Sequence, residues 1–123
     1  MSRWRSERGA AAVEFALVLP ILLTLVLGTI EFGRAYNVQI SLTHAARETV
    51  RSMAISNNWP NAVSRGRAAA PSLVPADMQF SANPTNCTPG TMIQVTVKYP
   101  LNTITGIASS MTLSGKAAMR CGG

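Results

Sequence analysis

The stretch 10-AAAVEFALVLPILLTLVLGTI-30 holds 21 residues, of which Glu14 is the only charged one. As an α-helix it would be about 31 Å long, roughly the thickness of the hydrocarbon core of a bilayer. A soluble protein of 123 residues has too little chain to bury such a helix on every side. We therefore expect a transmembrane helix over residues 10–30, loosened at Pro20, which lacks a backbone donor.

The residues before this run predict its orientation. Arg3, Arg5 and Arg8 precede it, so the positive-inside rule places the N-terminus in the cytoplasm and the rest of the chain outside. A cleaved secretory signal fits less well, because its apolar core is about 7–15 residues long and ends at an A-x-A-like site. The segment 28-GTIEFGRAY-36 offers no such site. We expect a basic cytoplasmic leader over 1–9 and a retained anchor after it.

A helical pattern continues over residues 31–54, which we expect to form an amphipathic extension of the same helix from about Ala10 to Ala54. Its apolar and small residues recur at steps of three and four. His44 lies on the opposite side and is expected to be a solvated helix residue rather than a catalytic base. The predicted stripe consists of Phe32, Ala35, Tyr36, Val38, Gln39, Leu42, Ala45, Ala46, Thr49, Val50 and Met53.

Residues 55–76 are rich in proline and turn formers, and we expect them to form a linker. Asn58 can cap a short helix with Pro60 in its first turn, running to about Ala70. Trp59 lies at the start of this helix, and the sequence allows it to pack either at the membrane interface or on the domain that follows.

Residues 77–123 are expected to form a small antiparallel sheet of about three strands. In 91-TMIQVTVKY-99, apolar residues from Ile93 to Tyr99 alternate with polar ones, which is the period of a half-buried strand. The segment 111-MTLSGKAAMR-120 alternates in the same way, with Met111, Leu113, Ala117 and Met119 on one face. A shorter candidate is 77-DMQFSA-82. The expected fold is α+β, with the sheet packed on the apolar stripe of the long helix.

The two cysteines, Cys87 and Cys121, are widely spaced, and the chain has one histidine. A zinc site needs about four closely spaced ligands, so we expect no metal and no cofactor. Outside the cytoplasm a Cys87–Cys121 disulfide is the natural pairing, and two separate buried thiols are the alternative.

The net charge of +6 raises the question of nucleic-acid binding. Apart from the leader, the basic residues are thinly spread and no aromatic residues interleave with them, so this class is not favoured. An enzyme is not expected either, because the sequence shows no Ser/His/Asp grouping, paired carboxylates or phosphate-binding glycine loop.

Gly9, the following AAAVEF and the apolar run resemble the processing and assembly signal of type IV pilin-like proteins. More narrowly, 5-RSERGAAAVEFALVLPILLTLVLGTIEFGRAYN-37 and 45-AARETVR-51 resemble the TadE-like family of the tight-adherence (Tad, or Flp) pilus system. The resemblance implies cleavage by a prepilin peptidase between Gly9 and Ala10, and subunit assembly through Glu14 and Phe15. Prepilins of this system commonly have Glu-Tyr where this chain has Glu14-Phe15.

This resemblance implies a minor pilin, or pseudopilin, in the bacterial inner membrane, with its C-terminal domain in the periplasm or beyond. Other pilin subunits and inner-membrane assembly proteins would be its partners. Some relatives with this segment stay uncut, so a second role follows as well: a membrane-anchored accessory subunit of a secretion complex that never enters a filament.

Overall fold

The structure is a computed structural model that describes residues 2–104, 106 and 111–122, with side chains from Glu7 onward. It has two units, Met1–Gly33 and Arg34–Gly123. Three antiparallel strands accompany the long N-terminal helix, so the α+β class is confirmed. The elements in chain order are α1 (Ser2–Ser56), α2 (Trp59–Ala68), the 3-10 helix η1 (Pro75–Asp77), β1 (Gln79–Asn83), β2 (Met92–Leu101) and β3 (Met111–Arg120).

The N-terminal unit consists of the first part of α1. This helix begins at Ser2, eight residues before the predicted start at Ala10, because residues 2–8 contain no glycine or proline to prevent it. It also continues through Pro20. The hydroxyls of Thr24 and Thr29 donate to the backbone carbonyls of Pro20 and Leu25, at 2.7 and 2.8 Å. Both hydroxyls therefore have hydrogen-bond partners within the helix.

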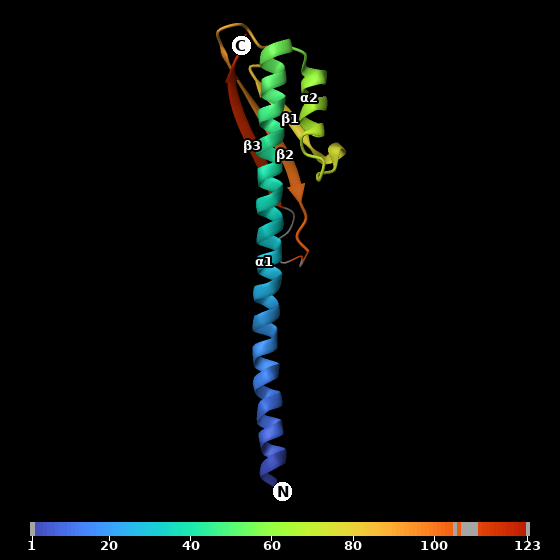
Figure 1. Cartoon of the computed structure of the whole chain (residues 1–123), viewed down its shortest axis with the longest axis vertical. Coiled ribbons are helices and arrows are strands. Elements are labelled where there is room, and N and C mark those ends of the chain that lie inside the picture. Colours follow the sequence, from blue (N-terminus) through green and yellow to red (C-terminus); the bar gives the residue numbers. More distant parts are fainter. Residues whose placement is uncertain (1, 105, 107–110, 123) are drawn as a thin grey trace. The chain divides into compact units, whose positions relative to one another are not determined.

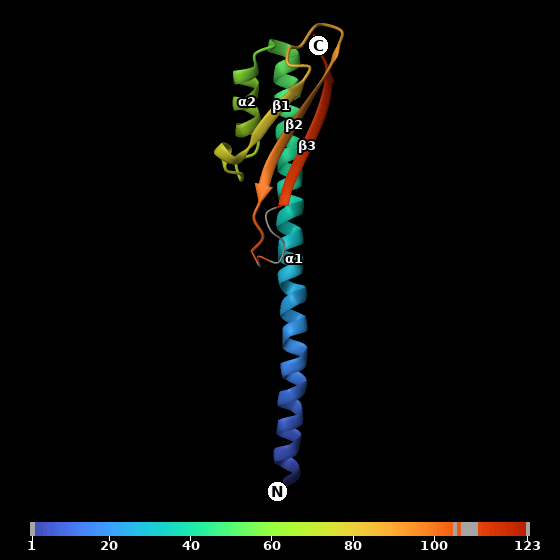
Figure 2. The ribbon, with the colours of Figure 1, turned by 180° about the vertical axis from the view of Figure 1, so that it is seen from behind.

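The C-terminal unit packs one face of the sheet against α1. The strand order is β1-β2-β3, with Phe80 opposite Val97 and Val97 opposite Gly115. Figure 1 shows α1 and α2 in front of the sheet. Figure 2, from behind, shows the other face of the sheet with no described helix over it. The sheet is therefore covered on one side, as its alternating pattern requires.

The core confirms most of the predicted stripe. Val38 is the first stripe residue that packs against the core, and the buried members of α1 then follow at helical spacing. Phe32 and Tyr36, in contrast, are 75% and 62% exposed, because they precede the part of α1 that carries the core. The fully buried side chains of α1 and β2 are Leu42, Ala45, Ala46, Thr49, Val50, Met53, Ile93, Val95 and Val97.

Two glycines let the elements approach closely. A Cβ built on Gly115 in β3 would lie 2.5 Å from the carbonyl carbon of Leu42 and 2.7 Å from the amide nitrogen of Thr43. One built on Gly66 in α2 would lie 2.7 Å from the Phe80 ring and would overlap the hydroxyl of Thr49. Leu42 and Thr49, which these two Cβ atoms would meet, lie on the face of α1 that packs on the core. Met111, which was predicted to face inward, is the first residue of β3 and is 43% exposed.

The connection between the helices is built from two asparagines. Asn57 has a left-handed φ of 49°, which asparagine tolerates, and it ends α1. The side chain of Asn58 then accepts a hydrogen bond from the amide of Asn61 at 3.2 Å and caps α2. The predicted cap is thus confirmed, and α2 ends at Ala68, two residues before the predicted limit. Trp59 packs against the core of the domain.

Candidate functional site

The predicted processing site lies on the exposed surface of α1. Gly9 and Ala10 are both exposed, and a Cβ built on Gly9 would meet nothing within 4 Å. Glycine inside a helix destabilises it by about 0.5–1 kcal/mol relative to alanine. Packing within the described chain therefore does not require a glycine at this position, and the residue is free to serve recognition by another protein.

Glu14 and Phe15 lie in a helical surface that nothing in the described N-terminal unit covers. Glu14 is exposed, and Phe15 is 65% exposed. Since one turn contains 3.6 residues, Glu14 lies on the same face as Ala10 and about 6 Å further along the axis. The other large exposed apolar residues of the segment include Val13, Leu17, Val18, Ile21, Leu22, Leu23 and Leu25.

By length and composition, α1 is a candidate membrane span, with an apolar window of which none is buried in the structure. A continuous apolar surface of this length needs lipid or other protein segments around it. The segment can therefore serve as an anchor, as an assembly surface, or as both in turn.

The structure joins Cys87 and Cys121 in a disulfide, with Cα atoms 5.5 Å apart. The backbone amide of Cys87 donates to the side-chain oxygen of Asn57 at 2.9 Å, and that of Cys121 to the carbonyl of Thr91 at 2.8 Å. The loop after β1 and the chain end after β3 are thus held together beside the end of α1. Asn57 was not predicted to have this role. An asparagine directly after a helical pattern was its only sequence signal.

Replacing Cys87 and Cys121 together by serine is expected to lower the free energy of unfolding by about 3–4 kcal/mol, the chain-entropy value for a loop of this length. Urea titration of the detergent-solubilised protein measures the change. Adding reductant should lower the stability of the original protein to that of the double-serine variant and leave the variant itself unchanged. Equal stability of the two proteins without reductant would contradict the prediction.

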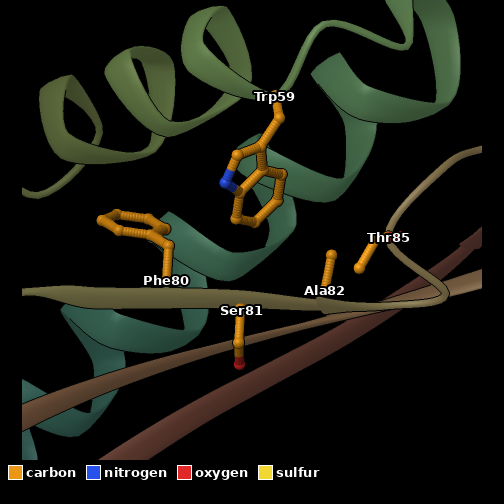
Figure 3. Close-up of a pocket in the computed structure, with 5 residues that line it drawn as sticks. All are labelled: Trp59, Phe80, Ser81, Ala82 and Thr85. Carbon is orange, nitrogen blue, oxygen red and sulfur yellow. The ribbon is translucent and has the colours of Figure 1, made fainter.

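A hollow of about 320 Å³ lies between α2 and β1, lined by Trp59, Phe80, Ser81, Ala82 and Thr85. Figure 3 shows the two aromatic rings facing the same space, while the Ser81 side chain points to the opposite side of β1. The guanidinium of Arg67 lies 5.6 Å from the centre of the Phe80 ring. The wall is mostly apolar and the side chain of Ser81 is turned away (Figure 3), which leaves Thr85 as the one hydroxyl-bearing side chain at the hollow, with no histidine or carboxylate among the lining residues.

The other residues considered for chemistry lie apart. His44 is exposed on α1, where it lines a shallow hollow with Gln39, Ile40, Thr43 and Arg47. Among the residues that the structure describes, no three His, Cys, Asp or Glu side chains gather in a way that could hold a metal ion.

Comparison with known proteins adds one finding. Residues 9–51 match the model of the family described as TadE-like protein. The match begins at Gly9 and includes the apolar run and the buried stripe of α1 as far as Val50. A search of curated proteins found no match, and neither did a search of solved structures. The family points to the tight-adherence pilus system and is a structural, non-enzymatic one. Over residues 9–51, which is less than half of the chain, this protein is similar to the TadE-like family.

Proposed function

We propose that this protein is a minor pilin, or pseudopilin, of a bacterial tight-adherence pilus and contributes to pilus biogenesis. The observation that carries this proposal is the surface of α1 over residues 10–30. Every residue there is exposed, and Glu14 is the only charge. A helix that served only as an anchor would gain nothing from a carboxylate, because a charge in the apolar layer is unfavourable. A helix that assembles with others can use the carboxylate to select a partner and a register.

The leader supports one orientation in the bacterial inner membrane. Arg3, Arg5 and Arg8 favour a cytoplasmic N-terminus. The disulfide-closed domain would then lie in the oxidising periplasm, where such a bond persists. A prepilin peptidase, other pilin subunits and inner-membrane assembly proteins are the partners of this proposal.

An accessory binding subunit that never enters a filament is the second candidate. It is favoured by Phe15, which differs from the Glu-Tyr pair common in prepilins of this system. The two candidates differ at Gly9, because only a subunit that follows the filament pathway needs to be cut there.

We expect the mature protein to begin at Ala10. Cleavage after Gly9 removes three arginines and Glu7, so eight basic and four acidic residues remain and the net charge falls from +6 to +4. Intact-mass and N-terminal mass spectrometry of membrane-extracted protein measures this directly. Gly9→Val should block cleavage, because a branched side chain fills the space that glycine leaves at the scissile bond.

Gly33→Ala is the matched control, since Gly33 is also a helical glycine whose Cβ would meet nothing within 4 Å. This variant should be cleaved normally. An N-terminus at Met1 or Ser2, in cells with an active prepilin peptidase, would reject the cleavage and favour the accessory subunit.

A further inference from the structure

Strand β3 presents a free edge whose hydrogen-bonding groups can be assigned. The amide of Cys121 donates to the carbonyl of Thr91, directly beyond the pair Met92–Arg120. In an antiparallel ladder, alternate residues turn their N–H and C=O groups toward the partner strand. The odd-numbered residues of β3 therefore bond to β2, and the even-numbered ones point away from the sheet.

Contacts to α1 close this edge at both ends. The side-chain amide of Gln39 donates to the carbonyl of Ser114 at 2.8 Å, and the amide of Gly122 donates to the carbonyl of Ala54 at 3.1 Å. Both Ser114 and Gly122 are even-numbered, as the assignment requires. Between them the outward groups of Lys116, Ala118 and Arg120 have no hydrogen-bond partner among the described residues, and all three residues are exposed.

No described helix or strand lies beside this open stretch on the side of β3 that faces away from β2 (Figures 1 and 2). Figures 1 and 2 show α2 on the β1 side of the domain and no described element beyond β3 on the other side. A row of unpaired backbone groups of this kind is a template for another strand. The open stretch can bond to about five residues of an added strand, with alternate side chains of that strand pointing to either face of the sheet.

On the face of the sheet that packs against α1, a hollow lies beside the open stretch. The cavity of about 350 Å³ on α1 is lined by Gln39, Ile40, Thr43, His44 and Arg47. It adjoins β3, because Gln39 reaches Ser114 and the amide of Thr43 lies against Gly115. Ile40 is 51% exposed there. Side chains of an added strand that point toward α1 would therefore find both an apolar contact and the cation of Arg47.

The basic residues near the open edge of β3 favour an added strand that carries negative charge. Lys116 and Arg120 project from the outer face of β3, and the three strands contain no Asp or Glu. The unit Arg34–Gly123 as a whole has eight basic and two acidic residues. A second copy pairing β3 with β3 about Ala118 would set Lys116 against Arg120, and directly opposed like charges destabilise a strand pair.

We propose that residues 116–120 of β3 bind an extended acidic segment of another protein as a fourth strand. Backbone hydrogen bonds to Lys116, Ala118 and Arg120 would supply affinity, and carboxylates on alternate positions would supply specificity. This inference does not depend on filament membership, because either a pilin or an accessory subunit could use the edge.

The test uses the full chain in nanodiscs of zwitterionic lipid and a fluorescein-labelled nine-residue peptide that alternates glutamate with valine or threonine. We expect saturable binding by fluorescence anisotropy. Hydrogen exchange of the amides of Lys116, Ala118 and Arg120 should slow at least about fivefold when the peptide is bound, because these groups become paired. Unchanged exchange at all three amides would overturn the proposal.

Variants and control peptides separate strand pairing from simple charge attraction. Ala118→Pro removes an outward N–H without touching the β2 ladder, and Lys116→Glu reverses a flanking charge. Each should weaken binding at least about tenfold, a change of about 1.4 kcal/mol. Lys98→Glu, on the same face of the central strand β2, should weaken it less than about threefold. Equal losses for Lys98→Glu and Lys116→Glu would overturn the proposal.

A peptide with proline at its centre keeps the charge but cannot complete the ladder, and one with lysine in place of glutamate keeps only the backbone pairing. Neither should bind measurably. These two controls use the unsubstituted protein, so they do not depend on how well any variant folds. Binding of the proline peptide equal to that of the parent would refute strand addition.

Discussion

Glu14→Ala is expected to lower co-purification of the proposed minor pilin with its pilin partners at least about tenfold, while membrane insertion and cleavage remain as before. Cleavage after Gly9 would leave Ala10 with a new α-amino group, which is cationic near neutral pH. In an assembly, a neighbouring subunit shifted along the helix axis by about 6 Å brings its own amine level with Glu14. Removing the carboxylate leaves that amine unpaired among apolar side chains, which costs about 3–5 kcal/mol.

The measurement is quantitative recovery of partner pilins with the tagged protein from solubilised membranes, together with its amount in sheared pili. Glu14→Gln should behave like Glu14→Ala, because it removes the same charge and keeps the shape. Glu7→Ala is the matched control, since it deletes a carboxylate in the leader that cleavage would discard. Normal recovery and normal piliation in the Glu14→Ala strain would leave Glu14 as a tolerated interfacial acid.

Gly115→Val is expected to lower the free energy of unfolding by about 3 kcal/mol or more, at or above the upper end of the usual range for overpacked cores. The added Cβ would meet the backbone of Leu42 and Thr43 in α1, at 2.5–2.7 Å. A backbone cannot rotate out of the way as a side chain can, so β3 and α1 would have to separate. That separation exposes Val97, which lies opposite Gly115 and is fully buried. Domain stabilities total only about 5–15 kcal/mol, so the effect is a large fraction of the whole.

Thermal unfolding followed by tryptophan fluorescence in detergent measures this change. Ala118→Val adds volume to the same strand on its exposed outward side and should change the stability by less than about 0.5 kcal/mol, as most surface substitutions do. A Gly115→Val protein as stable as the control would show that α1 and β3 do not approach as closely as described.

Several elements of this protein were predictable from the sequence because their signals are local. The apolar run of residues 10–30 needs only its own composition to identify a helix of membrane length. The cap of α2 depends on Asn58 and the residues directly after it, and β2 depends on a strict alternation from Ile93 to Tyr99. Each of these involves a short segment whose own chemistry decides its conformation or its buried side.

The remaining features depend on which surfaces meet, and this only the tertiary structure decided. Trp59 was compatible with two environments, and its packing against the domain core follows from the path of α2. Tyr36 fits the helical stripe as well as Val38 does, yet the core cluster begins at Val38.

The free edge of β3 illustrates the same limit. Periodicity assigns side chains to the two faces of a strand, but not its hydrogen-bonding groups to a neighbour, since these depend on register. Gly115 carried a weak signal, a glycine within an alternating strand, which is typical of a close backbone approach. The sequence by itself determined the apolar helix, the cap and the buried faces. Which backbone lies against Gly115, and which edge of the sheet stays open, depend on contacts between residues far apart in the chain.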